Sequence, residues 1–363
     1  MNTENLLSIK NLKKYFPMPK KSLFSKERPF LRANDGISFD IKKGEVFGLV
    51  GESGSGKSTL GRAVLQLHKP TEGQVLYYGR SREEFLPEYV KKDEEEGAGV
   101  DLTRLTAAEL RALRKDLQII FQDPYSSLDP RMTVGQLIEE GVATHRFFKR
   151  GSEEMRTYVQ KIMEECGLRA DMAHRFPHQF SGGQRQRICI ARALAVKPKF
   201  VVCDECVSAL DVSVQSQILN LLSDLKEREG LTYLFISHDL SVVRYISDRI
   251  GVMYLGRIVE QGEAEEVFKN PRHPYTVALL SAIPSVEKDR KEGRILLDGN
   301  MPSPVYPPSG CPFHTRCFMA QDKCKRVPAP LVEVKNGHFA ACHFAQIDTE
   351  EKRKIAMKNK ALV

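Results

Sequence analysis

The sequence predicts an α/β fold in which helices pack on a mainly parallel β-sheet. Two observations predict this class. The first is that short apolar runs typical of strands alternate with longer segments whose apolar residues recur at helical spacing. Strands that alternate with helices are typical of parallel sheets. The second is a glycine-rich segment that joins an early apolar strand to a helix, which is the usual context of a phosphate-binding loop.

The elements are expected in a definite order along the chain. Strands are predicted at 6–12, 36–41, 44–50, 116–123, 199–205 and 232–239. Helices are predicted at 57–67, 135–145, 152–168, 215–228 and 241–250, and one more after the SGGQ segment. The proline- and lysine-rich residues 16–30 predict a loop, and the acidic residues 83–96 predict a surface insertion. A domain boundary is expected near Gly262, beyond which the chain is proline-rich and predicted to be irregular.

Size and charge limit the classes of function. The chain has 363 residues, more than one average domain, and a net charge of +8. Its basic segments, 10–32 and 352–360, lack the interleaved aromatic residues that stack on bases, so we expect solvated segments and no nucleic-acid partner. No apolar run approaches the roughly 18–20 residues that cross a bilayer, and the first residues do not resemble a signal peptide. Any role at a membrane therefore requires a partner that spans it.

The segment GESGSGKST, residues 51–59, matches the phosphate-binding motif G-x-x-x-x-G-K-[ST]. Its glycines allow backbone N–H groups to surround a polyphosphate, and the following helix N-terminus adds positive potential. Lys57 is predicted to neutralise the β- and γ-phosphates, and Ser58 to offer its hydroxyl group to Mg²⁺. ATP and Mg²⁺ are therefore the expected ligands. The predicted ATP-binding residues of this loop are Gly51, Ser53, Gly54, Ser55, Gly56, Lys57, Ser58 and Thr59.

An acidic pair ends the apolar run FVVCDE. In a fold with a phosphate-binding loop, such a strand lies beside the loop, so Asp204 is expected to hold Mg²⁺ through water. Glu205 is then placed to act as the general base that polarises the attacking water. An Asp-Glu pair alone is usually solvated surface, but the preceding hydrophobic strand makes this pair unusual.

The segment FSGGQRQR, residues 180–187, resembles the signature motif of the ATPase subunits of ABC transporters. The resemblance implies a RecA-like P-loop NTPase core, an antiparallel β subdomain, a helical subdomain at about 123–185 and a small irregular C-terminal domain containing cysteines. It divides the chain into a nucleotide-binding domain at 1–262, an oligopeptide-transporter-type domain at 263–345 and a basic tail at 346–363. Cys206 departs from the proline that usually follows the catalytic glutamate in the family.

The resemblance also assigns roles to other residues. Gln122 matches the glutamine that senses Mg²⁺ and the attacking water, and His238 matches the histidine that contacts the γ-phosphate, so both join Glu205 as predicted catalytic residues. Phe16 lies where the family stacks an aromatic ring on adenine, and Tyr15 is the alternative. In the family, the signature motif and the SALD segment of one subunit contact ATP held by another. The residues that inherit this role are Ser181, Gly182, Gly183, Gln184 and Asp211.

The chain has one phosphate-binding loop and one signature motif, so the resemblance implies that two cassettes must associate to complete a site. The segments 122–138 and 270–284 resemble the branch that imports oligopeptides and dipeptides, and TLGRAVLQL resembles its second ATPase subunit. The implied partners are a related ATPase subunit (with a homodimer possible in isolation), two membrane-spanning permease subunits and, indirectly, an extracytoplasmic substrate-binding protein. The implied location is the cytoplasmic face of the inner membrane, with 125–131 and 176–179 as permease contacts.

The cargo is less defined, because the branch also includes importers of oligosaccharides and of nickel chelates. Two other classes of function are alternatives to a transport ATPase. A soluble ABC-type ATPase would usually carry a coiled coil or two cassettes in one chain, and this chain has neither. A regulatory module that does not hydrolyse ATP is disfavoured because Glu205 and His238 are present together with the complete signature motif.

The eight cysteines form two groups. Four lie in predicted core elements and are expected to be buried thiols: Cys166, Cys189, Cys203 and Cys206. The other four lie near the C-terminus in a proline-rich segment that a metal could hold together: Cys311, Cys317, Cys324 and Cys342. Four thiolates suit a [4Fe–4S] cluster or a Zn²⁺ ion, and the spacing departs from the C-x2-C pairs common in zinc sites. A [4Fe–4S] cluster is therefore the favoured cofactor, with zinc and free thiols as alternatives. The nearby histidines are expected to be bystanders: His314, His338 and His343.

Overall fold

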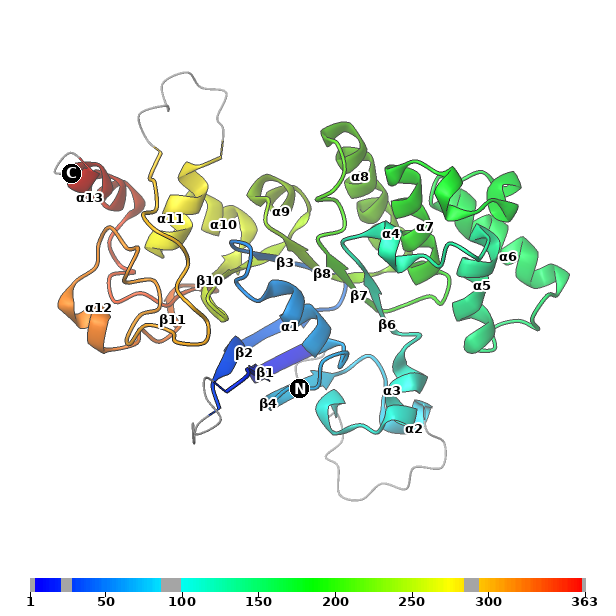
Figure 1. The fold of residues 1–363 in the computed structure, drawn as a ribbon, viewed down its shortest axis with the longest axis horizontal. Helices are drawn as coiled ribbons and strands as arrows, with labels where there is room; N and C mark the ends of the chain where they lie inside the picture. The colour runs from blue at the N-terminus through cyan, green and yellow to red at the C-terminus, as the bar shows by residue number, and fades with distance from the viewer. Residues whose placement is uncertain (1–3, 21–27, 86–98, 284–293, 361–363) are drawn as a thin grey trace. The chain divides into compact units, whose positions relative to one another are not determined.

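The computed structural model describes residues 4–20, 28–85, 99–283 and 294–360 (Figure 1). The chain forms two compact units, which we describe separately. Unit 1 contains residues 1–8, 40–46 and 75–236, and unit 2 contains residues 9–39, 47–74 and 237–363. Most of the acidic insertion predicted at 83–96 lies outside the described residues, and its start belongs to the short helix α2 (Arg82–Phe85).

The core of unit 1 is a parallel sheet, as the alternation of strands and helices predicts. β7 (Phe200–Asp204) pairs in parallel with β6 (Leu117–Ile120) on one side and with β8 (Thr232–Ser237) on the other. Every residue of β7 and β8 is buried. These strands are therefore continuous apolar runs, since both faces of a parallel sheet are covered.

Helices make up most of the rest of unit 1, and polar residues cap their first turns. Thr133, Ser152, Ser181 and Asp211 each accept a hydrogen bond from the backbone of the helix that they precede. These caps fix where each helix begins, in the regions that the sequence predicts. The helices are α3 (Ala107–Leu113), α4 (Pro124–Ser127), α5 (Val134–Thr144), α6 (Glu153–Glu165), α7 (Gly182–Leu194) and α8 (Val212–Glu229), with 3₁₀ turns at Leu102–Arg104, Ala170–His174 and Pro177–Gln179.

Unit 2 has a mixed sheet with the strand order β11-β12-β10-β9-β3. β3 and β9 are parallel, and each later neighbour in this sheet is antiparallel to the strand beside it. The strands are β3 (Val46–Val50), β9 (Arg249–Tyr254), β10 (Arg257–Glu263), β11 (Val332–Lys335) and β12 (His338–Ala340). The helices of this unit are α1 (Lys57–Val64), α9 (Leu240–Ile246), α10 (Ala264–Lys269), α11 (Pro274–Ser281), α12 (Asp322–Arg326) and α13 (Thr349–Lys360).

A second sheet corresponds to the β subdomain that the sequence predicts. It has four strands in the order β2-β1-β4-β5, and β4 and β5 are antiparallel. Its strands are β1 (Asn5–Pro17), β2 (Phe30–Lys42), β4 (Glu72–Tyr77) and β5 (Val100–Asp101).

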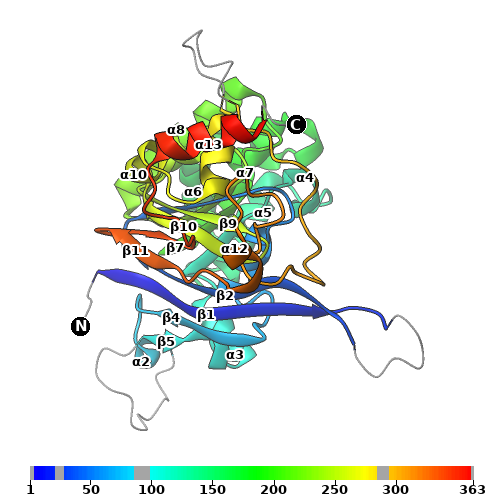
Figure 2. The ribbon, with the colours of Figure 1, turned by 90° about the vertical axis from the view of Figure 1, so that its left-hand side faces the viewer.

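The C-terminal region differs from the prediction in two respects. It contains the helices α10 and α11 in a part that was expected to be irregular. Its last helix, α13, packs against α11, so the prediction of a solvated basic segment at 352–360 is wrong (Figure 2). Lys352 is 0% exposed, and Ala356 joins Val277 and Ala278 in a small apolar core. The reason is that Ala356 and Met357 give this lysine-rich helix one apolar face.

Two boundaries also bear on the predictions. The helix expected at 241–250 ends at Ile246, because residues from Arg249 onward pair with β3 as strand β9. β12 pairs with β10, so residues on both sides of Gly262 share one sheet, and the domain boundary near Gly262 stays a prediction. In the described part of the chain, no helix combines the length and the apolar character that crossing a membrane requires.

Candidate functional site

The glycine-rich segment forms a tight loop between β3 and α1 in unit 2. Gly54 and Gly56 have φ values of +81° and +101°, which side chains other than glycine rarely adopt. At Gly56, a Cβ atom would also overlap the carbonyl oxygen of Ala33. Ser53 and Gly54 are exposed at the tip of the loop, while Ser55 is buried at its base. The backbone of this loop therefore depends on glycine at the positions that the motif specifies.

Lys57 is the first residue of α1, and its side chain turns back into the loop. Its Nζ atom donates hydrogen bonds to the carbonyl oxygens of Gly51, at 2.8 Å, and Glu52, at 3.0 Å. The side chain is only 4% exposed overall, so the ammonium group is held in the concavity of the loop. A buried cation at the N-terminus of a helix makes this loop an anion-binding site.

In unit 1, the structure brings together two of the predicted catalytic residues. The Nε2 atom of Gln122 donates a hydrogen bond to the Oε2 atom of Glu205 at 2.9 Å. Glu205 follows β7 with a φ of +49°, in the left-handed region that is uncommon for residues other than glycine. Asp204, the last residue of β7, is 1% exposed. A strained residue at the carboxyl end of a parallel strand is typical of a functional site.

The turn after Glu205 is held by hydrogen bonds. The Ser208 hydroxyl group, at 2.8 Å, and the Ser208 N–H group, at 3.1 Å, both donate to the Glu205 carbonyl oxygen. Cys206 is buried, at 2% exposed. The hydroxyl group of Ser208 therefore restrains the turn in which Cys206 replaces the family's proline.

The SGGQ segment presents a helix N-terminus at the surface of unit 1. Ser181 caps α7 by accepting a hydrogen bond from the Gln184 N–H group, and the Gln184 side chain accepts one from the Ser181 N–H group. Ser181 and Gly182 are exposed. Gly183 has no room for a side chain, because a Cβ atom there would overlap the side chain of Val214.

Asp211 lies on the exposed surface of unit 1 as the N-cap of α8. Hydrogen bonds from the Val214 N–H group and the Ser213 hydroxyl group hold the pKa of its carboxyl group below the ordinary value. His238 is exposed in unit 2, directly before Asp239, which caps α9.

The two candidate adenine-stacking residues of unit 2 have different surroundings. The Tyr15 hydroxyl group donates to Asp35, and burial together with this bond raises the pKa of Tyr15 to about 12. Phe16 is partly exposed, with its ring edge-on to His68 at 5.6 Å between centroids. The hydrogen bond of Tyr15 fixes its ring in the protein, so the geometry favours Phe16.

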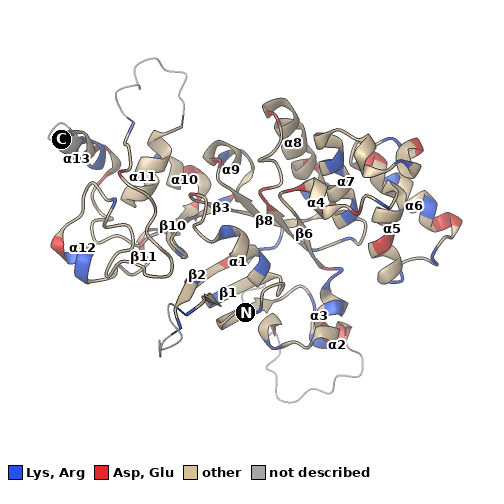
Figure 3. Ribbon diagram, in the orientation of Figure 1, with Lys and Arg blue, Asp and Glu red and all other residues tan. Residues whose placement is uncertain are grey.

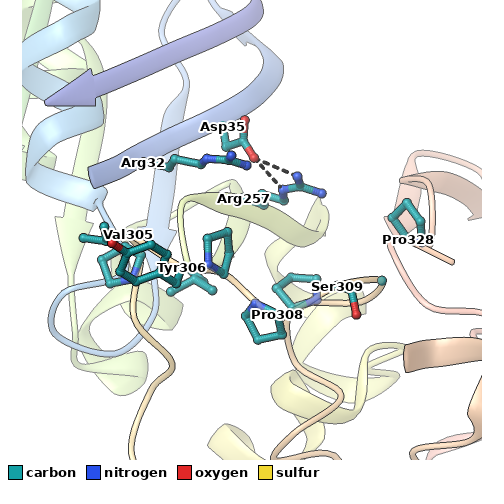
Figure 4. A pocket seen from close by; sticks show the side chains of 13 residues that line it. Arg32, Asp35, Arg257, Val305, Tyr306, Pro308, Ser309 and Pro328 are labelled. Atoms are coloured by element: carbon teal, nitrogen blue, oxygen red, sulfur yellow. Dashed lines mark hydrogen bonds and ion pairs between the residues drawn. The ribbon is translucent and has the colours of Figure 1, made fainter. Parts of the chain in front are cut away.

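Asp35 also forms the floor of a surface pocket in unit 2 (Figure 4). Its Oδ2 atom accepts a hydrogen bond from Arg257 Nη2 at 2.7 Å. Figure 4 shows Tyr306 and Pro308 on the opposite side of this pocket, from the proline-rich segment. Asp35 and Arg257 pair with each other in the lining of this pocket. No residue lining the pocket was predicted to be part of the site.

Among the predicted permease contacts, Tyr125 and Phe176 lie on the surface of unit 1, whereas Leu128 and Pro177 are buried. Tyr125 is 66% exposed, and its ring lies 3.8 Å from the Arg185 guanidinium carbon. Phe176 is 37% exposed and stacks on His178 with ring centroids 5.8 Å apart. The alternative that Tyr125 simply packs inside is therefore wrong.

All eight cysteines are free thiols, and the four predicted to be buried in core elements are buried. The four C-terminal cysteines line one small cavity in unit 2. Backbone N–H groups two residues further along donate to two of the sulfur atoms: Met319 to Cys317 and Phe344 to Cys342, each at 3.4 Å. Burial raises the pKa of Cys317 to about 12 and that of Cys342 to about 11.

No three histidine, cysteine or acidic side chains in the described ranges are grouped tightly enough to hold a metal ion. The three nearby histidines contact other groups. His338 Nε2 lies 2.7 Å from Glu260 Oε1, and ring nitrogens of His314 and His343 lie 2.9 Å from the carbonyl oxygens of Cys311 and Val327.

Comparisons with known proteins identify the family of the chain. The family model described as "ABC transporter" matches residues 34–208, and the model described as "Oligopeptide/dipeptide transporter, C-terminal region" matches residues 259–324. The oligopeptide transport ATP-binding protein AppF of Bacillus subtilis (strain 168) is 47% identical over 346 residues, covering 94% of this chain and 98% of AppF. The dipeptide transport ATP-binding protein DppF of Haemophilus influenzae is 47% identical over 338 residues, covering 93% of this chain and 96% of DppF.

Among solved structures, the dimeric bacterial ABC transporter cassette MJ0796 is similar, with a TM-score of 0.57 and 28% identity. The match covers 71% of this chain and 98% of that one. The chain is an ATP-binding cassette protein of the ABC transporter family. Within that family, it belongs to the ATP-binding subunits of oligopeptide and dipeptide transporters.

Sequence reasoning missed one set of contacts at the loop. Glu52 was not among the predicted site residues, yet its carboxylate pairs with Arg316, and its N–H group donates to the Tyr275 hydroxyl group. Arg316 lies 264 positions further along the chain, so no local spacing connects it to the loop.

The loop geometry predicts different effects at its two left-handed glycines. Gly54→Ala should lower the free energy of unfolding by about 1–2 kcal/mol, because its backbone conformation is disfavoured for alanine. The added Cβ atom itself would have no heavy atom within 4 Å. Gly56→Ala should lower the melting temperature further and abolish nucleotide binding, because its Cβ atom displaces Ala33. Thermal unfolding and titration with a fluorescent ATP analogue measure both effects. Equal behaviour of the two variants would contradict this geometry.

Proposed function

We propose that this chain binds and hydrolyses ATP to power the import of short peptides through an ABC transporter. The single observation that carries the proposal is the loop at Gly51–Thr59, which holds the buried ammonium group of Lys57 at a helix N-terminus. Such a site matches the charge and size of a triphosphate. The names of AppF and DppF support peptides as the cargo, with oligosaccharides and nickel chelates as alternatives.

In this proposal, different residues bind the phosphates, bind Mg²⁺ and activate the attacking water. Backbone N–H groups of the loop and Lys57 would bind the β- and γ-phosphates, and Ser58 and Asp204 would hold Mg²⁺. Glu205 accepts a proton from water as the water oxygen bonds to the γ-phosphorus atom. The bond from that phosphorus to the bridging oxygen breaks, and ADP leaves. The hydrogen bond from Gln122 orients the Glu205 carboxylate for this step.

We further propose that a neighbouring cassette completes the site. Ser181 and Gly182 are exposed at the N-terminus of α7, where they could reach a γ-phosphate held by a different subunit. MJ0796, which was solved as a dimer, supports this association. The neighbour is a second, related ATPase subunit in the complete transporter. In this proposal, two permease subunits contact the surface around Tyr125 and Phe176, and the chain lies on the cytoplasmic face of the inner membrane.

The role of Glu205 predicts a separation of binding from hydrolysis. Glu205→Gln should still bind ATP but hydrolyse it about 10²-fold more slowly or worse, because the amide cannot accept the proton from water. Glu227→Gln, an exposed glutamate on α8, is the matched control and should retain wild-type turnover. Phosphate release measures the rate, and a nucleotide titration measures binding. Turnover near the wild-type rate in Glu205→Gln would remove this residue as the base.

For the C-terminal cysteines, we propose a [4Fe–4S] cluster. Two observations support it: four thiols line one cavity, and backbone N–H groups point at two of the sulfur atoms. N–H groups directed at sulfur stabilise thiolates and tune such clusters. The cluster would hold the two ends of the C-terminal segment together, since Cys311 and Cys342 lie far apart in the chain.

This assignment predicts the metal content. Protein purified without oxygen should contain about four iron and four sulfide per chain, with the visible absorbance of a cluster. Cys317→Ser should lose most of the iron, whereas Cys189→Ala, at a buried thiol outside the four, should keep it. Zinc alone, or no metal in freshly purified wild-type protein, would reject the cluster.

A further inference from the structure

Two residues from the C-terminal part of unit 2 hold the phosphate-binding loop at one position, Glu52. The Nη1 atom of Arg316 donates to both carboxylate oxygens of Glu52, at 3.0 and 3.1 Å. The Tyr275 hydroxyl group accepts a hydrogen bond from the Glu52 N–H group at 2.9 Å. The carbonyl oxygen of the same residue is a partner of Lys57. The side chain, N–H group and carbonyl group of Glu52 are therefore all engaged.

Arg316 is a buried partner, not a surface one. Its side chain is 8% exposed, against 30% for the Glu52 side chain. Its Nε atom also lies 3.4 Å from the carbonyl oxygen of Asp298, and its guanidinium carbon lies 6.0 Å from the centre of the Tyr254 ring. Because so little of this arginine is exposed, loss of either partner would leave the other charge partly desolvated and unpaired.

The segment that carries Arg316 is itself fixed next to the loop by aromatic packing. Phe313 is 0% exposed, and its ring lies 5.2 Å from that of Tyr254 and 5.3 Å from that of Tyr275. Tyr254 and Tyr275 also contact each other, at 4.8 Å between centroids. Tyr254 ends β9 and Tyr275 lies in α11, so the three rings join the core sheet to the segment between Cys311 and Cys317. The packing of these rings therefore holds the segment that carries Arg316 in place beside the loop.

The charge of Glu52 explains why the loop needs this partner. A carboxylate on a loop that surrounds a triphosphate would repel the phosphates if it were not neutralised. The Arg316 guanidinium group neutralises the Glu52 carboxylate, while the Tyr275 hydroxyl group holds the backbone N–H group of Glu52. We propose that Arg316 is a positioning residue that neutralises and orients Glu52, so that the cysteine-bearing segment sets the affinity of the loop for ATP. This inference rests on the proposed ATP-binding function.

The test is a set of variants of the full-length chain, assayed for binding of Mg-ATP by equilibrium titration. Arg316→Gln should weaken ATP binding about tenfold, because the Glu52 carboxylate beside the phosphates loses its partner. Arg316→Lys should recover part of the affinity, because it restores the charge without the two-point contact. The double variant Glu52→Gln/Arg316→Gln should bind ATP more tightly than Arg316→Gln, because the unpaired carboxylate is gone.

Arg326→Gln is the matched control. Arg326 is an exposed arginine of the same segment, on α12, where Figure 3 shows acidic and basic residues together. The Arg326→Gln variant should bind ATP with the affinity of the wild type. Melting temperatures of all variants identify any that fail to fold. If Arg316→Gln does not fold, the ATP affinity of Arg316→Lys is compared with that of the wild type instead.

The outcomes separate this inference from the function on which it rests. If wild-type protein does not bind Mg-ATP, the proposed function fails. If the wild type binds and Arg316→Gln matches Arg326→Gln, only the positioning role is overturned. If Arg316→Gln binds ATP more weakly than the wild type and the double variant Glu52→Gln/Arg316→Gln binds no better than Arg316→Gln, then Arg316 stabilises its segment without acting through Glu52. The inference is wrong in that case too.

Discussion

The burial of the Lys57 ammonium group is the constraint on which the candidate site depends. A cation that is almost fully buried must be paired or hydrogen-bonded, and here two carbonyl oxygens of its own loop satisfy it. In the same loop, glycines at 54 and 56 adopt left-handed conformations. The glycine pattern and the buried cation are thus features of the same candidate phosphate-binding loop.

Around this loop, unit 2 provides support from distant parts of the chain. β3 leads into the loop, the aromatic rings of Tyr254, Tyr275 and Phe313 pack together, and Arg316 pairs with Glu52. The cysteines on either side of Phe313 and Arg316 belong to the same supporting segment. The phosphate-binding loop is thus held by contacts to the segment that carries these cysteines.

The parts of the fold that local rules govern could be predicted from the sequence. The phosphate-binding loop and the buried strand ending at Asp204 each follow from adjacent residues, and the structure contains them. A helix was expected after the SGGQ segment, and α7 begins within that segment, at Gly182. The α13 helix was missed because its lysines dominate its composition, while Ala356 and Met357, which bury it, are few. The pair Glu52–Arg316 could not be predicted, since no periodicity or motif connects residues 264 positions apart.

The most direct test of the account is whether Lys57 contributes to triphosphate binding. Equilibrium titration of the purified full-length chain with Mg-ATP, compared with Lys57→Ala, measures this contribution. The account predicts saturable binding by the wild type and an affinity at least about tenfold weaker in the variant, because a charge-assisted contact to the phosphates is lost. Equal affinities of the two proteins, with both correctly folded, would contradict it.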